Sequence, residues 1–261
     1  MNAPVDVVGR VHEVLKALAA HEPDGVRTSD LARATGIARP TAHRLLSTLA
    51  RVGLADRDAA TERWLLGPEL HFLGAAAASR YDVTQIAQPF VRRLADATDE
   101  SAFFSARRGD ETICLIREDG AFPLRSHVLH EGARFPLGVV SAGMVILAHL
   151  SDREVDDYLV GADLSTGYGP QHGRDRVREH IAATRRRGYS VNPGLVVQGS
   201  WGMAAAVFDR EGNPSGALSL TGVEHRFHAE RRPELGALLM RQAHELTKAL
   251  AAPRRRDAAG R

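Results

Sequence analysis

Residues 39–51, RPTAHRLLSTLAR, interleave hydrogen-bonding side chains with an apolar stripe. At helical spacing the stripe falls on one face and the polar side chains stay on the other. Guanidinium groups bind phosphates and guanine edges, and short hydroxyls bind phosphates and bases, so this face has the chemistry of a DNA-contacting surface. Its members are Arg39, Thr41, His43, Arg44, Ser47, Thr48 and Arg51. The alternative is a solvated face of an ordinary helix.

The basic character of this region is local. The whole chain has a formal net charge of +2, from 34 Lys and Arg against 32 Asp and Glu. Between residues 27 and 63, seven arginines stand against four acidic residues, so an anionic partner must be met by this patch. The seven are Arg27, Arg33, Arg39, Arg44, Arg51, Arg57 and Arg63.

The elements around the basic face predict a winged helix-turn-helix. Apolar spacing predicts a helix over 7–20 and a second over SDLARATG, with Thr28 or Ser29 as its cap. Gly36 ends the second helix and Pro40 opens the third, an arrangement typical of helix termini. Two helices joined by so short a turn predict a helix-turn-helix. The segments GLADRD and ERWLLG predict a two-stranded wing that packs back on the helices.

A helix that starts at about residue 68 follows the wing, and we place the domain boundary there. A further helix over 82–98 contains Pro89, which predicts a kink or an interruption. From about Ser101 the pattern becomes strand-like. SAFFSARRGDETICLIRED predicts two strands, and FPLRSHVLHEGARFPL a third strand and its return.

Helices are expected over SAGMVILAHL, DREVDDYLV and RDRVREHIAATRRRG, a hairpin over GMAAAVFDREGNPSGALSLTG, and a last helix over about 233–250. Mixed helices and hairpins predict an α+β domain on an antiparallel sheet. Ser219 and Thr221 alternate with two leucines, which places both hydroxyls on one face of a strand. Hydroxyls on a concave face can orient a small polar ligand, but they can also be solvated strand residues.

Catalytic, metal and membrane signals are weak. Cys114 is the single cysteine, which excludes an internal disulfide and a thiolate metal cluster. His127 and His130 fall on opposite faces of a predicted strand, and the histidines of HRFH lack a carboxylate cluster. GSWG lacks the spacing of a nucleophile elbow. With no apolar signal core and no membrane-spanning run, we expect a cytoplasmic protein without catalytic residues, metal or cofactor.

The segment TSDLARATGIARPTAHRLLSTLARVGLADRD, with ERWLLGPELHFLG after it, resembles the winged helix-turn-helix of IclR-type bacterial transcriptional regulators. EGARFPLGVVSAGMVILAHL is similar to the segment that lines the family's effector pocket, and RRRGYSVNPGLVVQGSWGMAAAVFDREGNPSGALSLTG to its C-terminal signature. The resemblance implies a winged helix-turn-helix joined by a helix to a GAF-like α+β effector domain. We therefore expect a DNA-binding domain over 1–67, a connecting helix over 68–80, an effector-binding and oligomerisation domain over 81–252, and a disordered tail over 253–261.

The resemblance also implies site residues. Arg39, Thr41, His43 and Arg44 match the family's base-reading turn by position. The full expected DNA-binding set is Ser29, Arg39, Pro40, Thr41, His43, Arg44, Ser47, Arg51, Arg57 and Arg63. The expected effector-binding set is Phe135, Val139, Ser141, Ala142, Asn192, Trp201, Gly202, Ser219 and Thr221.

Three positions depart from the family pattern. Asn192 replaces a residue that is often acidic, Gly202 one that is often Cys, and Ser141 stands in place of a Gly. These departures favour a flat aromatic or amide-bearing effector over a small keto acid.

The expected partners are double-stranded DNA with a near-palindromic operator, a small organic effector, and further copies of the chain in a homodimer or a dimer of dimers. The expected function is ligand-responsive control of catabolic genes, as a repressor rather than an activator. Two alternatives stay open. One is an enzyme whose N-terminal helices only mediate assembly, and the other is an architectural DNA binder that needs no ligand.

Overall fold

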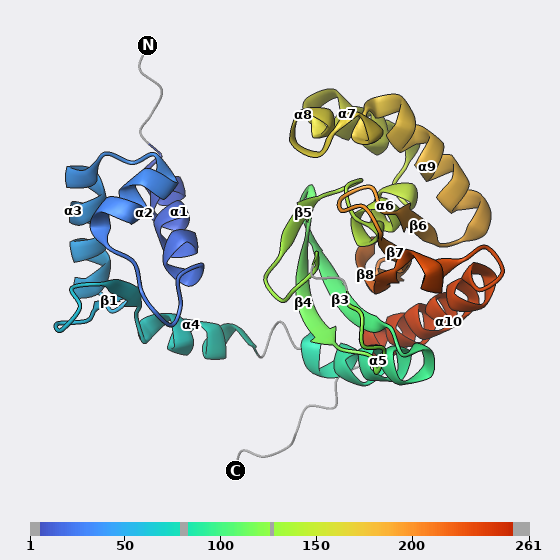
Figure 1. Ribbon diagram of the computed structural model, residues 1–261, viewed down its shortest axis with the longest axis horizontal. Helices are drawn as coiled ribbons and strands as arrows, with labels where there is room; N and C mark the ends of the chain where they lie inside the picture. Colours follow the sequence, from blue (N-terminus) through green and yellow to red (C-terminus); the bar gives the residue numbers. More distant parts are fainter. Residues whose placement is uncertain (1–5, 79–82, 126–127, 253–261) are drawn as a thin grey trace. The chain divides into compact units, whose positions relative to one another are not determined.

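The computed structural model describes residues 6–78, 83–125 and 128–252. The chain divides into two compact units, Met1–Asp82 and Val83–Arg261, each with its own hydrophobic core (Figure 1). The expected tail and the last two residues of the expected connecting helix lie outside the described residues.

The N-terminal unit is a winged helix-turn-helix, as predicted. Its elements in order are α1 (Val7–Ala19), α2 (Thr28–Thr35), α3 (Arg39–Arg51), β1 (Ala55–Arg57), β2 (Trp64–Leu66) and α4 (Glu69–Ala78). The antiparallel strands β1 and β2 form the wing. Leu18, Leu31, Leu46 and Trp64 meet in a single core, so the wing is anchored to all three preceding helices. Gly36 ends α2 in the left-handed conformation, and proline lies in the first turn of α3.

The predicted cap of α2 is wrong. The helix begins at Thr28, and the preceding residue, Arg27, makes no side-chain capping bond. The Thr28 hydroxyl instead accepts a hydrogen bond of 2.9 Å from the indole Nε1 of Trp64. The hydroxyl that was expected to cap the helix is thus engaged with a residue 36 positions away in sequence.

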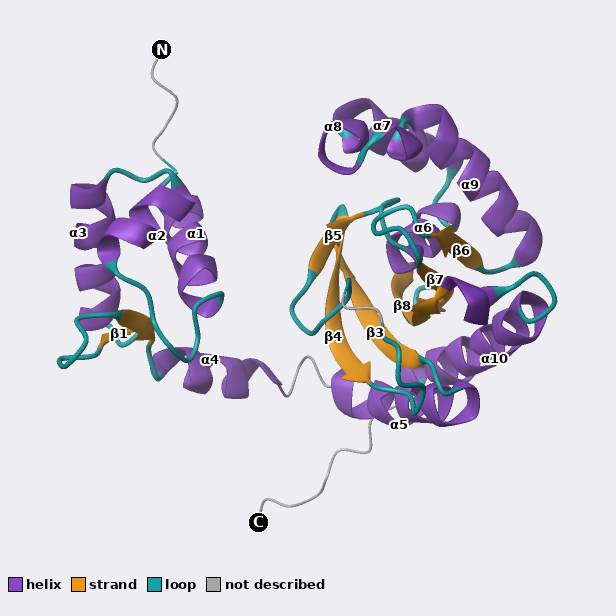
Figure 2. Ribbon diagram, viewed as in Figure 1, coloured by secondary structure: helices purple, strands orange, loops and turns teal. Residues whose placement is uncertain are grey.

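The C-terminal unit is built on a six-stranded antiparallel sheet with the order β5-β4-β3-β8-β7-β6 (Figure 2). Its elements are α5 (Val83–Thr98), β3 (Ser101–Arg108), β4 (Glu111–Glu118), β5 (Arg134–Pro136), α6 (Ser141–Ala148), α7 (Asp152–Gly161), α8 (Leu164–Tyr168), η1 (Pro170–His172), α9 (Arg174–Arg187), β6 (Ser190–Pro193), β7 (Ser200–Phe208), β8 (Pro214–Val223), η2 (Glu224–Phe227) and α10 (Arg232–Ala251). The fold class is the one predicted.

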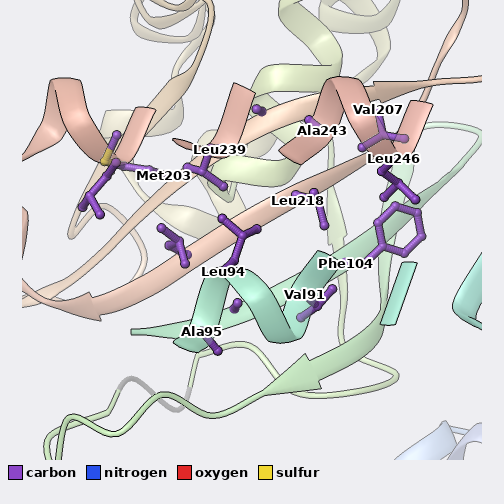
Figure 3. Packing of buried hydrophobic residues seen from close by; sticks show 14 of the residues in the cluster. Val91, Leu94, Ala95, Phe104, Met203, Val207, Leu218, Leu239, Ala243 and Leu246 are labelled. Carbon is purple, nitrogen blue, oxygen red and sulfur yellow. The ribbon is translucent and has the colours of Figure 1, made fainter. Parts of the chain in front are cut away.

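The two faces of this sheet are covered by different helices. Residues of α5 and α10, among them Leu94 and Leu239, pack on one face against Met203 and Leu218 (Figure 3). Residues of α6, α7 and α9 pack on the other face, against Ala204 and other small side chains. Neighbouring residues of β7 and β8 therefore point into different cores, and this alternation decides which of them can reach a ligand.

Several predicted elements need correction. In the segment predicted as a third strand and its return, only β5 is a strand among the described residues. Gly132 adopts a φ of +81° and Leu129 is buried against Phe103 and Cys114, so turn geometry and packing replace strand pairing. Helix α5 is continuous through Pro89, without the expected interruption. The short α8 and β6 were not predicted.

Candidate DNA interface and ligand pocket

The polar face of α3 is exposed. Arg39, Pro40, His43 and Arg44 are all solvent-accessible, and so are Ser47 and Arg51 farther along the helix. Their apolar neighbours Ala42, Leu46 and Leu49 are buried in the core. No acidic residue lies in the first turn of α3, and the unpaired N–H groups of a helix N-terminus favour an anion there.

A groove of about 950 Å³ runs between this face and the wing. It is lined by Arg27, Thr28, Ser29, Arg39, Pro40, His43, Arg44, Arg57, Thr61 and Glu62. Four arginines and a single glutamate make the groove strongly basic, in contrast to the nearly neutral chain. The structure thus brings together six of the predicted DNA-binding residues.

The wing side of the groove is ordered by local hydrogen bonds. The Asp58 carboxylate accepts bonds from the backbone of Ala60 at 2.7 Å and Thr61 at 3.3 Å. These bonds, of which the one from Ala60 contributes most, hold the pKa of Asp58 below its ordinary value. The charged carboxylate therefore fixes the backbone of the wing turn. Arg57 forms an ion pair with Glu62 at 3.1 Å.

Four predicted DNA-binding residues lie outside this groove. Thr41 is half-buried and faces a second groove beside α1. Arg63 donates hydrogen bonds to the carbonyl oxygens of Asp24 and Gly25, which fixes the turn before α2. Ser47 and Arg51 are exposed but lie beyond the groove along α3.

Sequence reasoning did not assign Arg27, Thr28, Thr61 and Glu62 to this surface. Arg27 was counted among the seven arginines between residues 27 and 63, and that count was the sequence signal that pointed to it.

The second candidate site is a small cavity of about 30 Å³ in the C-terminal unit. Its lining residues are Val128, Leu129, Val140, Ser141, Ala142, Asn192, Val196, Ser200, Trp201, Gly202 and Thr221. None of them carries a formal charge. The cavity has room for about one water molecule.

Two hydroxyls of β8 have no hydrogen-bond partner, and of these Thr221 lines the cavity whereas Ser219 lies outside its lining. Within the described residues, Ser219 Oγ and Thr221 Oγ1 are the buried side-chain oxygens left unpaired. Ser219 is fully buried, so the alternative of solvated strand residues is wrong for it. Thr221 pairs with Gly202 across β8 and β7, and Gly202 pairs with Asn192 on β6.

The cavity is closed on the other side by the N-terminus of α6. A Cβ atom on Gly202 would lie 3.0 Å from Ser141 Oγ, so the glycine permits the close approach of this helix. The residue before α6 supplies no side-chain cap, and the first N–H groups of a helix lack partners within it. The Asn192 amide is already held, because Nδ2 donates to Val139 O and Oδ1 accepts from Leu195 N, each at 2.9 Å.

Six of the nine predicted effector residues line the cavity, but the Trp201 indole points away. It packs in the core beneath α10, where the Arg232 guanidinium carbon lies 5.4 Å from the centroid of its ring. Phe135 packs toward Tyr168, and Val139 contributes a carbonyl oxygen to the amide of Asn192. The Trp201 ring, which was expected in the effector pocket, is therefore turned to the opposite face of the sheet, because successive residues of β7 alternate between faces.

Membrane and metal signals add nothing to these two sites. No group of three or more metal-binding side chains occurs among residues 6–78, 83–125 and 128–252. In the same ranges, no helix is both long and apolar enough to cross a bilayer. His127 lies outside the described residues, and His130 lies in a loop rather than the predicted strand.

Comparison with known proteins covers nearly the whole chain. Residues 7–59 match the IclR helix-turn-helix domain, and residues 75–248 match the family described as bacterial transcriptional regulator IclR C-terminal. The transcriptional repressor IclR of Escherichia coli is 26% identical over 95% of this chain and 93% of its own length. The HTH-type transcriptional regulator KipR of Bacillus subtilis is 28% identical over 84% of this chain and 86% of its own.

Solved structures show the same fold. An IclR transcriptional regulator from Alicyclobacillus acidocaldarius superposes with a TM-score of 0.79 at 24% identity, covering 95% of this chain and all of its own. An IclR homolog from Microbacterium hydrocarbonoxydans, crystallised with 4-hydroxybenzoate, has a TM-score of 0.76 at 22% identity and covers 93% of this chain and 98% of its own. The family consists of DNA-binding regulators with a C-terminal effector domain, not enzymes. The alternative that this chain is an enzyme is therefore wrong. The chain described here belongs to the IclR family of bacterial transcriptional regulators.

Proposed function

We propose that this regulator reads its operator with the groove between α3 and the wing. The observation that carries the proposal is the exposure of Arg39, His43 and Arg44 on one side of that groove and of Arg57 on the other. Arginine suits bidentate contacts with guanine, and the uncapped N-terminus of α3 suits a phosphate. We propose that the DNA-binding part spans 1–67, the connecting helix 68–80 and the effector-binding part 81–252.

The test of the DNA proposal is a titration of a duplex selected from random sequences by the wild-type chain. Arg44→Ala should weaken binding to this duplex by about 1–3 kcal/mol and relax its sequence preference. Arg33→Ala is the matched control, because Arg33 is exposed on α2 and pairs with Asp30 outside the groove. Unchanged affinity of the Arg44 variant would refute the assignment.

We further propose that a homodimer, or a dimer of dimers, places two such grooves on a near-palindromic operator. Successive major grooves on one side of a duplex are separated by about 34 Å, which sets the expected spacing of the half-sites. Repression of catabolic genes in the cytoplasm is the proposed role of this chain, and the Escherichia coli relative named above is a transcriptional repressor. Footprinting with the chain at concentrations that shift its oligomeric state tests the half-site spacing.

The proposed effector binds between the α6 N-terminus and β8. A small ligand with a hydrogen-bond acceptor, such as a carboxylate, would satisfy the unpaired hydroxyls of Ser219 and Thr221 and the first N–H groups of α6. No acidic side chain opposes it, since Asn192 is neutral. The other members of the proposed set are Phe135, Val139, Ser141, Ala142, Trp201 and Gly202.

An aromatic or amide-bearing effector remains the expectation from the departures at Asn192, Gly202 and Ser141. A cavity of about 30 Å³ cannot hold a ring as it stands, because an engineered cavity that binds benzene has about 150 Å³. Such an effector would therefore need more room than this cavity provides. A ring that carries a carboxylate, such as the 4-hydroxybenzoate of the Microbacterium relative, would combine both features.

Thermal shift of the full chain distinguishes these classes. A ligand that binds only the folded state raises the melting temperature by mass action. Glyoxylate, 4-hydroxybenzoate and benzamide at the same concentrations represent the keto acid, the aromatic acid and the amide. Stabilisation by glyoxylate alone would exclude the aromatic expectation. A shift by no member of a broad metabolite panel would favour the ligand-independent DNA binder.

Effector control requires unequal binding to two arrangements of the regulator. We propose α4 as the lever, because it follows the wing directly and leads toward the effector part. Its side chains from His71 to Ala76 are exposed within the N-terminal unit, so little in that unit resists a change in its direction. Replacing two residues of α4 by glycine should uncouple DNA release from effector binding while each ligand still binds.

A further inference from the structure

The side chain of Trp64 contacts three residues of the basic groove. Trp64 opens β2, is 4% exposed, and lies in the core of the N-terminal unit. Its indole touches Thr28 of α2, His43 of α3 and Arg57 of β1. Behind the lining of the groove, one buried ring thus meets residues of the second helix, the third helix and the wing.

Each contact constrains a side chain that faces solvent. The indole Nε1–H donates to Thr28 Oγ1 at 2.9 Å. The His43 ring meets the indole edge-on, with ring centroids 6.3 Å apart and an interplanar angle of 85°. The Arg57 guanidinium carbon lies 5.5 Å from the indole centroid, and the same guanidinium pairs with Glu62.

We propose that Trp64 is a positioning residue for DNA recognition, which sets the directions of His43 and Arg57 before DNA arrives. The inference rests on the proposed function, because it needs these two side chains to contact DNA. An exposed arginine or histidine loses rotamer freedom when it binds. A side chain already held against a buried ring loses less, so the contact improves affinity for the correct sequence without touching the duplex.

The experiment uses the full chain with Trp64→Phe. Phenylalanine keeps an aromatic ring in the core but removes the N–H group and half of the stacking surface. The probes are a duplex selected from random DNA by the wild-type chain and an unselected duplex of the same length. We expect affinity for the selected duplex to fall about tenfold, and affinity for the unselected duplex to change less than about threefold.

A double-mutant cycle separates positioning from folding. In the His43→Ala background and in the Arg57→Ala background, the Trp64→Phe change should each time cost less than in the wild-type chain, because one of the two side chains that it positions is gone. Leu18→Ala is the matched control, since Leu18 is buried in the same core but contributes to none of these contacts. It should lower the melting temperature while the ratio of selected to unselected affinity stays at the wild-type value.

These measurements distinguish failure of the positioning role of Trp64 from failure of the proposed DNA contacts. If Trp64→Phe costs the same factor in all three backgrounds, or if Leu18→Ala reproduces its loss of selectivity, Trp64 is structural only and the inference is overturned. If His43→Ala and Arg57→Ala leave the selected affinity unchanged, the proposed DNA contacts themselves are wrong. Should Trp64→Phe not fold, Thr28→Val removes the acceptor of the indole N–H without entering the core. It should lower the selectivity ratio about threefold, and an unchanged ratio would overturn the inference.

Discussion

Removal of the Ser219 hydroxyl from the core of the C-terminal unit should stabilise this protein. Ser219 is fully buried on β8 and its Oγ has no hydrogen-bond partner. A buried polar group without a partner costs about 1–3 kcal/mol of desolvation free energy. Ser219→Ala removes that cost and leaves a space too small to matter, so we expect the free energy of unfolding to rise by about 1 kcal/mol.

Ser190 provides a control of opposite sign. It is equally buried and lies on β6 of the same sheet, and both serines are opposite Ala204 on β7. Its hydroxyl, however, donates to Ser141 O at 2.7 Å. Ser190→Ala leaves that carbonyl without this donor and should cost about 1–3 kcal/mol. The same substitution at the two positions that flank Ala204 is therefore expected to have opposite effects.

The assay is thermal unfolding of the full chain without ligand. For a domain of this size, 1 kcal/mol corresponds to about 2–4 °C, so Ser219→Ala should raise the melting temperature by about 2–4 °C and Ser190→Ala should lower it by about 2–12 °C. The stabilised Ser219→Ala variant should also gain less from a saturating effector, because it lacks a hydroxyl that we propose to bind the effector. If Ser219→Ala lowers the melting temperature as Ser190→Ala does, the Ser219 hydroxyl is satisfied in the free protein and the reasoning about the ligand site fails.

Three further predictions concern single groups. Glu100 is 1% exposed and forms ion pairs with two arginine guanidinium groups. Glu100→Gln should therefore lower the free energy of unfolding in urea by about 3 kcal/mol, and an unchanged urea midpoint would contradict this. Burial raises the pKa of the Cys114 thiol to about 12, so an aromatic disulfide reagent should label the native chain at pH 8 far more slowly than the urea-unfolded chain; equal rates would show the thiol to be accessible. The hydrogen bond from Arg117 holds the pKa of Asp119 below its ordinary value, so the carboxylate stabilises the fold above the unfolded pKa of about 4 and that contribution is lost as pH falls through the folded pKa. Asp119→Asn should therefore flatten the acid side of the melting-temperature profile, which an identical profile for both chains would exclude.

Local sequence was sufficient for the DNA-binding half. The apolar stripe of α3, Gly36 at the end of α2 and the proline in the first turn of α3 act over a few residues, and they specify the helix-turn-helix without distant contacts. The same stripe assigned the exposed face correctly, because helical periodicity alone separates Arg44 from Leu46. The bond between the indole and Thr28 joins residues 36 positions apart, and no local pattern encodes it.

Tertiary structure decided what surrounds the effector cavity. Alternation along β8 was enough to place Ser219 and Thr221 on one face, but not to show that their hydroxyls are buried and unpaired. Whether the Trp201 ring or the Gly202 backbone faces α6 depends on which helices cover each face of the sheet. The Phe135 ring packs against Tyr168, a contact that the sequence pattern does not indicate. A one-dimensional pattern sets which residues share a face, whereas the identity of that face follows from strand order and long-range packing, which only the folded chain defines.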